Sequence, residues 1–266
     1  MTEPWLTVKR GEAPLLVSFP HTGVQFPAEC IGDLVGLRLA RRDADWHIDK
    51  LYAFAAELGA TLVHTALSRT VIDVNRDPSG VSLYPGQATT GLVPTETFDG
   101  RPLYRDGGAA PAAAEIERRK RLYFAPYHAA LGAELKRLRA RHARVVLYDC
   151  HSIRSVIPRL FPGELPVFNV GTNDGAACDP ALASAVAAIC AASRRSHVVN
   201  GRFKGGFITR TYGKPTDGIH AVQMELAIRG YLPNENDDPR WDAGFAKPIQ
   251  QTLRAVLEAC LAFARG

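Results

Sequence analysis

The stretch that decides the fold reads Leu-Leu-Val-Ser-Phe-Pro-His at residues 15–21, and Val-Val-Leu-Tyr-Asp-Cys-His at residues 145–151 repeats its pattern. Continuous apolar runs of this kind are typical of parallel strands buried on both faces. In open α/β sheets, ligands bind beyond the carboxyl ends of such strands. We therefore expect His21 and His151 to meet at one sheet edge, where two imidazoles suit a shared metal ion. The alternative is that each histidine merely ends a strand.

Strand-like and helix-like segments alternate along the rest of the chain. Further strands are expected at residues 61–65, 70–74, 166–170, 197–200, 207–212 and 220–226. Helices are expected at residues 45–58, 111–141 with a break near Pro126, 179–191 and 241–264. This order predicts a mostly parallel or mixed sheet covered by helices. No Gly/Ser linker divides residues 1–266, so we expect a single catalytic α/β domain with a long loop excursion at about 77–110.

Composition narrows the class of protein. The five cysteines are odd in number and lack a Cys-x-x-Cys pair, which argues against a disulfide framework and favours a reducing, cytoplasmic setting. We expect no membrane partner, because no signal peptide is recognised and no run approaches the roughly 20 apolar residues of a membrane span. The net charge is +5, but acidic and apolar residues interrupt the basic clusters at 118–144. We therefore expect a small anionic substrate and no nucleic acid.

The third metal ligand is expected within Asp-Ala-Asp-Trp-His-Ile-Asp at residues 43–49. Catalytic zinc usually has three histidine or carboxylate ligands and keeps a fourth position for water. Asp45 is either such a ligand or, like Asp43, a candidate N-cap of the following helix. His47 is a ligand, a partner of a ligand, or a surface residue on the first turn.

Two segments supply cations and a directional donor: Ser-Arg-Thr-Val-Ile-Asp-Val-Asn-Arg at 68–76 and Gly-Gly-Phe-Ile-Thr-Arg-Thr-Tyr-Gly at 205–213. Guanidinium groups bind carboxylates through paired hydrogen bonds, so several of them near one site suit a substrate with two carboxylates. The alternative is a structural salt bridge between Arg69 or Arg76 and Asp73 or Asp77. The candidates for substrate contact are Arg69, Asn75, Arg76 and Arg210.

A candidate general base lies in His-Ala-Val-Gln-Met-Glu-Leu at residues 220–226. In a strand, Gln223 and Glu225 share one face, opposite Val222 and Met224. A carboxylate at the sheet edge beside a metal-bound water can take the water's proton and later give it to the leaving nitrogen. The alternative is a surface glutamate without a role.

Taken together, these motifs resemble the N-formylglutamate amidohydrolase family. The likeness spans about residues 15–232, and seven motifs occur in the same order. They are Ser-Phe-Pro-His-Thr-Gly, Asp-Trp-His-x-Asp-x-Leu-Tyr, Ser-Arg-x-x-x-Asp-x-Asn-Arg, Leu-Tyr-Pro-Gly-Gln, Asp-Cys-His-Ser, Gly-Gly-Phe-Ile-Thr-Arg-x-Tyr-Gly and His-Ala-x-Gln-x-Glu-Leu.

The resemblance implies a zinc-exopeptidase-like fold, a three-layer α/β/α sandwich with a mixed, mostly parallel central sheet that is distantly similar to zinc carboxypeptidases. It also implies one zinc ion per chain. It implies hydrolysis of N-formyl-L-glutamate to formate and L-glutamate, at the end of one bacterial route of histidine degradation. An alternative is a zinc deacylase or carboxypeptidase that acts on another N-acyl amino acid. A third interpretation is a non-enzymatic protein that binds anions or nucleic acid.

The similarity to carboxypeptidases also implies residue roles. In that pattern an Asn-Arg pair holds the substrate carboxylate, a second Arg polarises the scissile carbonyl, and a Glu is the base. The carboxylate-binding role falls on Asn75 and Arg76, and we add Arg210. The polarising role falls on Arg69 and the role of base on Glu225.

The metal ligands depart from the carboxypeptidase pattern. Carboxypeptidases place a ligand Glu three residues after the first His, and this chain has Val24 at that position. We therefore expect zinc on His21, Asp45 and His151, with His47 as the alternative third ligand.

Overall fold

A seven-stranded sheet forms the centre of the computed structural model, which describes residues 5–105 and 110–266. The strands lie in the order β1-β3-β2-β4-β7-β5-β6. Their bounds are β1 Leu6–Lys9, β2 Leu15–Phe19, β3 Thr61–Thr65, β4 Val145–Ile153, β5 Phe168–Gly171, β6 His197–Val199 and β7 Ile219–Ala227. The pairs β1–β3 and β5–β7 are antiparallel, whereas β3–β2, β2–β4, β4–β7 and β5–β6 are parallel. The expected mixed, mostly parallel sheet is confirmed.

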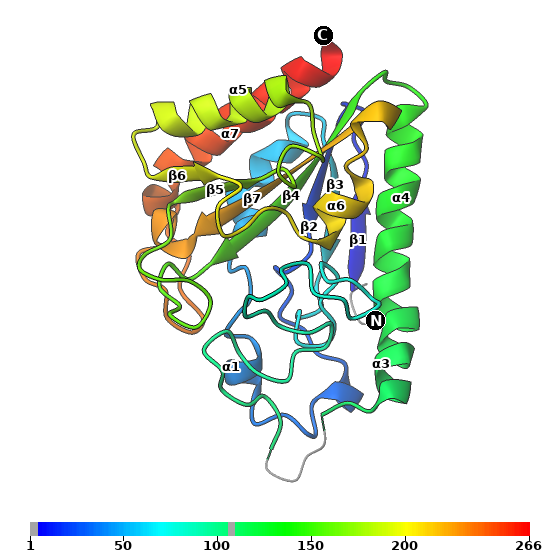
Figure 1. Ribbon diagram of the computed structural model, residues 1–266, viewed down its shortest axis with the longest axis vertical. Coiled ribbons are helices and arrows are strands. Elements are labelled where there is room, and N and C mark those ends of the chain that lie inside the picture. The colour runs from blue at the N-terminus through cyan, green and yellow to red at the C-terminus, as the bar shows by residue number, and fades with distance from the viewer. Residues whose placement is uncertain (1–4, 106–109) are drawn as a thin grey trace.

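Helices cover both faces of this sheet (Figure 1). The helices are α1 Leu37–Ala40, α2 Ile48–Leu51, α3 Ala113–Arg119, α4 Ala125–Arg139, α5 Pro180–Ala192, α6 Phe207–Tyr212 and α7 Ala243–Arg265. Alternate residues of β2 point to opposite faces, as the pleat of a strand requires. Leu15 packs with α5 and α7 in one core cluster, and Leu16 packs with α4 and α6 in another. The three α/β/α layers are therefore confirmed.

Two expected strands are wrong. Residues 70–74 form turns, because Ser68 accepts hydrogen bonds from the backbone of Thr70 and Val71. Residues 207–212 form helix α6 instead of a strand. The helix expected at 45–58 is only the short α2 followed by a 3-10 turn at Ala53–Ala56. Its N-cap is His47 in the left-handed region (φ 58°), so the expectation of an aspartate cap is wrong.

The expected break near Pro126 is a local widening of one continuous helical run. A π-helical segment, Lys120–Phe124, joins α3 to α4, and proline stands at the start of α4. Proline has no backbone N–H and its ring collides with the carbonyl four residues earlier, so the wider turn relieves a clash that would kink a regular helix.

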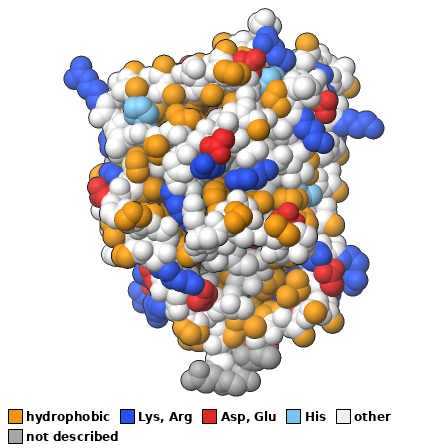
Figure 2. Space-filling view, viewed as in Figure 1, with side chains coloured by type: hydrophobic (Ala, Val, Ile, Leu, Met, Phe, Trp, Pro, Cys, Tyr) orange, Lys and Arg blue, Asp and Glu red, His pale blue; other side chains and the backbone are white. Residues whose placement is uncertain are grey.

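The loop excursion lies at one end of the sheet (Figure 1). Residues 77–105 hold no helix or strand and make only isolated bridges. The end of the expected excursion, residues 106–109, lies outside the described residues. On the face shown in Figure 2, basic side chains are scattered among apolar, acidic and uncharged ones. Within the described ranges, every helix is too short or too polar to cross a membrane.

Candidate active site and metal centre

His21, Asp45 and His151 converge at the carboxyl edge of the sheet. One ligand atom from each lies within 4.8 Å of the others. His21 lies just beyond β2, whereas β4 continues through His151 because it pairs with β7 as far as Ile153. The backbone N–H of Asp45 donates to the carbonyl of His21 (2.9 Å), which fixes the segment before α2 against the end of β2. All three side chains are buried.

Each imidazole is also held by a second aspartate. His21 Nε2 donates to Asp73 Oδ1 (2.7 Å), and His151 Nε2 donates to Asp149 Oδ2 (2.9 Å). The Nδ1 atoms of both rings lie on the side of Asp45, at 3.7 Å and 3.0 Å from its Oδ2. Histidines that bind metals usually give their other N–H to a carboxylate, which orients the ring.

The donor set fits a divalent metal ion. Within residues 5–105 and 110–266, His21 Nδ1 and Asp45 Oδ1 are buried without a hydrogen-bond partner. Such atoms are costly unless something binds them. A cation between the Nδ1 atoms and Asp45 would satisfy both, and two imidazoles with one carboxylate are among the ligand sets found at catalytic zinc sites.

The electrostatics of the two imidazoles differ. Burial lowers the pKa of His151, but Asp149 and Asp45 outweigh it and hold this pKa well above its usual range. Burial and the Arg69 guanidinium lower the pKa of His21, in spite of Asp73. Positive charge on His151 is thus favoured by the carboxylates around it, and the same carboxylates would favour a divalent cation.

His47 does not join this group. Its Nε2 lies 2.7 Å from the carbonyl oxygen of Pro239, and its ring packs near Trp46 and Trp241. Of the two third ligands considered from the sequence, the structure brings only Asp45 to the two histidines.

Glu225 on β7 is paired in register with His151 on β4, so it lies beside the group formed by His21, Asp45 and His151. Gln223 donates from Nε2 to Glu225 Oε2 (3.2 Å), so the two polar residues share a face as expected. Burial raises the pKa of Glu225 to about 8; Asp45 adds to the shift, and His151 opposes it. A carboxyl group tuned toward neutral pH is suited to accept and return a proton.

A cavity opens beside these groups, and we call it the arginine-lined cavity. It is lined by His21, Arg69, Asn75, Arg76, Tyr84, Ala88, Thr89, Thr90, Phe98, His151, Leu160, Arg202, Phe203, Gly206, Gln223 and Glu225. The loop excursion thus supplies part of the wall, from Tyr84 to Phe98. Three guanidinium groups, two imidazoles and one carboxyl group face one small space, a composition that suits an anionic ligand.

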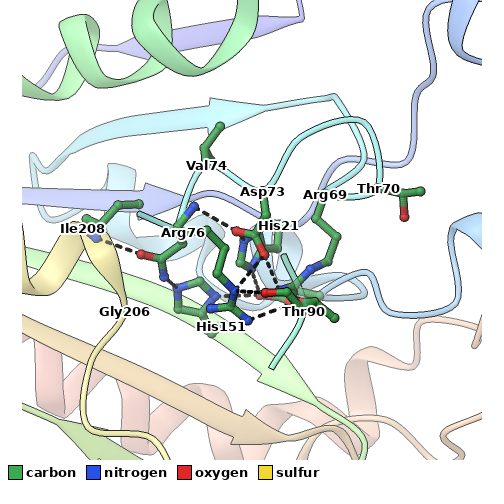
Figure 3. A network of polar contacts seen from close by, with 12 residues as sticks. His21, Arg69, Thr70, Asp73, Val74, Arg76, Thr90, His151, Gly206 and Ile208 are labelled. Carbon is green, nitrogen blue, oxygen red and sulfur yellow. Dashed lines mark hydrogen bonds and ion pairs between the residues drawn. The ribbon is translucent and has the colours of Figure 1, made fainter. Parts of the chain in front are cut away.

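Asp73 organises two of the arginines (Figure 3). Arg69 Nη2 lies 2.6 Å from Asp73 Oδ2, and Arg76 Nε lies 3.8 Å from the same oxygen. The structural salt bridge considered from the sequence is therefore present, and both arginines nevertheless line the cavity. Arg76 also donates to the carbonyl and hydroxyl oxygens of Thr90 (3.0 and 3.2 Å).

Asn75 lines the cavity, but its side-chain amide is hydrogen-bonded to other groups of the protein. Its Nδ2 donates to Asp149 Oδ2 (3.2 Å), and its Oδ1 accepts from the backbone N–H of Ile208 (2.8 Å). A Cβ at Gly206 would lie 2.5 Å from Asn75 Nδ2, so only glycine allows this approach of α6. Asn75 therefore ties α6 to the partner of His151.

Arg210 is not among the residues that line the cavity. It donates from Nε to the carbonyl of Gly205 (2.8 Å) and lies over the ring of Tyr84 at 5.2 Å. Arg202 lines the cavity instead, although no pattern in the sequence indicated it. A lone arginine in a loop has no spacing signal. Asp149 could have been identified from its spacing, because residues two apart on a strand share a face, as Asp149 and His151 do.

Comparison with known proteins gives a consistent result. The family model of N-formylglutamate amidohydrolase matches residues 13–232. An N-formylglutamate deformylase of Pseudomonas aeruginosa is 48% identical over 98% of this chain and 97% of that protein. One of Pseudomonas putida is 46% identical over 97% and 96%. The crystal structure of an N-formylglutamate amidohydrolase from Ralstonia eutropha JMP134 superposes with a TM-score of 0.80 at 26% identity, over 97% and 96% of the two chains. This chain belongs to the N-formylglutamate amidohydrolase family.

Proposed function

We propose that this protein hydrolyses N-formyl-L-glutamate to formate and L-glutamate, with one zinc ion held by His21, Asp45 and His151. The observation that carries the proposal is the buried group of these three residues beside an arginine-lined cavity. The names of the two Pseudomonas relatives support the choice of substrate. We further propose a cytoplasmic place in histidine degradation. Five free, buried cysteines suit a reducing compartment.

When bound, the zinc ion would acidify a water molecule and polarise the formyl oxygen. Asp73 and Asp149 hold the ligand imidazoles in orientation. Glu225 takes a proton from the water as the water oxygen bonds to the formyl carbon. The C–N bond then breaks, and Glu225 gives the proton to the departing amino nitrogen. Arg69, beside Asp45 at 3.8 Å, stabilises negative charge that develops on the formyl oxygen.

Arg76 is proposed to bind the α-carboxylate of the substrate. Its bonds to Thr90 use Nε and Nη2, so Nη1 can serve a ligand. Asn75 acts as a positioning residue in this proposal, since Asp149 and Ile208 occupy its side chain.

The test is formate release from three substrates under the same conditions. N-formyl-L-glutamate is expected to react faster than N-formyl-L-aspartate or N-acetyl-L-glutamate. Faster cleavage of either competitor would replace this proposal with deacylation of another N-acyl amino acid. Turnover of none of the three would leave a binding protein as the better interpretation.

Metal content provides a second readout of the same proposal. One zinc per chain is expected in the wild type and in His47→Ala, and loss of zinc in His21→Ala and His151→Ala. If His47→Ala lost its zinc as His21→Ala and His151→Ala do, the third ligand would be His47 and not Asp45.

A further inference from the structure

Arg202 is a half-buried cation in the wall of the arginine-lined cavity. Within the described part of the chain, no carboxylate lies within salt-bridge distance of its guanidinium. Arg69 and Arg76, in contrast, both have Asp73 as a neighbour. A charged group out of bulk water without a counter-ion is costly, so its presence in a cavity points to an anionic ligand.

The side chain of Arg202 is held firmly in place. Its Nε donates to the carbonyl of Leu160 (2.9 Å), and its Nη2 donates to that of Ala88 (2.9 Å). The guanidinium lies over the rings of Tyr84 and Phe203, at 5.3 Å from each. These bonds leave Nη1 for a ligand. A group fixed in this way loses little conformational entropy on binding.

Tyr84 in turn is held by two backbone groups close to Arg202 in the chain. Its hydroxyl donates to the carbonyl of Gly205 (3.0 Å) and accepts from the backbone N–H of Lys204 (3.1 Å). The loop excursion and the segment that carries Arg202 are thus bonded to each other. Arg202 therefore belongs to a segment that is hydrogen-bonded to the loop excursion.

Two positive groups share this part of the cavity. Burial lowers the pKa of Arg202, and the charge of Arg76 lowers it further, while Tyr84 and Glu225 oppose the shift. Arginine nevertheless stays protonated in proteins. Two like charges that act on each other at one cavity favour the binding of anionic groups between or beside them.

We propose that Arg202 binds the side-chain carboxylate of the N-formyl amino acid and so selects for an acidic side chain. This inference rests on the proposed function. The α-carboxylate is close in bonds to the scissile amide, and Arg76 is close to the metal group through Asp73, which holds His21. The side-chain carboxylate is further along the substrate. Arg202 suits it, because its contacts are with Leu160, Ala88 and aromatic rings rather than with that group.

The experiment compares kcat/KM for N-formyl-L-glutamate and its neutral isostere N-formyl-L-glutamine. Arg202→Met is expected to lower kcat/KM for N-formyl-L-glutamate by about 100-fold, mainly through KM, because a buried charged contact is lost. Turnover of N-formyl-L-glutamine should change by less than about threefold, since an uncharged amide gains little from the cation.

Two arginine variants serve as matched controls. Arg254→Met also removes a guanidinium that lies over an aromatic ring, that of Phe54 at 4.8 Å, but on α7. It should leave both rates unchanged. Arg210→Met removes the other cation over Tyr84, and it is expected to leave the ratio of the two rates unchanged.

An equal loss for both substrates in Arg202→Met would overturn the proposal, because a structural or α-carboxylate role predicts that result. If Arg202→Met shows no cooperative thermal unfolding, Arg202→Lys is used as the test. Lysine keeps the positive charge but lacks the planar, forked guanidinium. The ratio of kcat/KM for N-formyl-L-glutamate to that for N-formyl-L-glutamine should therefore fall by about tenfold; an unchanged ratio would overturn the proposal. A wild type that turns over neither substrate would instead contradict the proposed function.

Discussion

At the residue scale, Asp149 orients the ring of His151 by accepting a hydrogen bond from its Nε2 (2.9 Å), the ring nitrogen that faces away from Asp45. Replacing Asp149 with Asn removes the charge and keeps the shape. We expect zinc affinity to fall by about 10- to 100-fold, the usual effect of losing a carboxylate that holds a ligand histidine. Competition with a chelator measures this affinity. Asp99→Asn, which alters a carboxylate paired with Arg42, is the control, and equal affinities in the two variants would contradict this role.

Glu225 provides a prediction about chemistry rather than metal binding. Glu225→Gln keeps the volume beside Gln223 but cannot accept the water's proton. Zinc content should remain normal while kcat falls by about 100- to 10,000-fold, the usual contribution of a general base. Near-normal kcat with full zinc occupancy would remove Glu225 from the mechanism.

The sequence predicted the residues at the ends of strands better than those in loops. His21, His151 and Glu225 could be located because a buried strand fixes both the direction and the edge of its side chains. Arg202 could not, since its position depends on carbonyls at Ala88 and Leu160, far away in the chain. Asn75 was found, but its role differs from expectation because Ile208 and Asp149 use its amide.

At the element scale, α6 shows why local propensity failed. Phe207–Tyr212 is rich in β-branched and aromatic residues, which favour strands. Contacts from distant residues decide otherwise: Asn75 Oδ1 accepts from Ile208, and Gln223 Oε1 accepts from the backbone N–H of Gly206 (2.7 Å). These bonds satisfy backbone donors at the helix start, which no residue within the segment does.

Helix α4 carries a titrating group that makes stability depend on pH. His128 Nε2 lies 2.8 Å from the carbonyl of Val74, and its Nδ1 lies 3.1 Å from Tyr212 Oη. Burial lowers the pKa of His128 to about 4, from an ordinary value of 6.5. Between these two values the unfolded chain binds the proton and the folded chain does not, so the contribution of His128 to stability falls as the pH falls.

Denaturant unfolding at pH 6.5 and pH 4.5 checks this linkage. From pH 6.5 to 4.5, the wild type should lose up to about 2 kcal/mol more free energy of unfolding than His128→Gln. The glutamine variant controls for other groups that titrate in the same range, such as His64 and the carboxylates. The same loss in both proteins would contradict the low pKa of His128.

At the scale of the whole molecule, the layer order and the parallel centre of the sheet followed from buried apolar runs alternating with helices. The pairing of three short strands could not be predicted from the sequence, because each has too few residues to show a pattern. These are the edge strands β1 and β6 and the antiparallel strand β5. The turn at 70–74 escaped prediction for a different reason. Its β-branched residues suggest a strand, but Asp73 must reach both His21 and Arg69, and a turn places it between them.

Zinc binding should stabilise the molecule as a whole, because the proposed ligands come from three separate segments that meet only in the folded state. Zinc at about 100 times its Kd adds about 2.7 kcal/mol. The melting temperature should rise by about 5 to 10 °C, as measured by calorimetry. His21→Ala should show no zinc-dependent shift, and a shift equal to that of the wild type would place the stabilising zinc elsewhere.

The central claim is that His21, Asp45 and His151 together hold the catalytic zinc. Anomalous X-ray scattering at the zinc absorption edge, from crystals of the zinc-loaded protein, tests it most directly. One strong peak per chain is predicted among His21 Nδ1, the carboxylate of Asp45 and His151 Nδ1. A peak bound by His47, or zinc bound only at sites away from these three side chains, would contradict the claim.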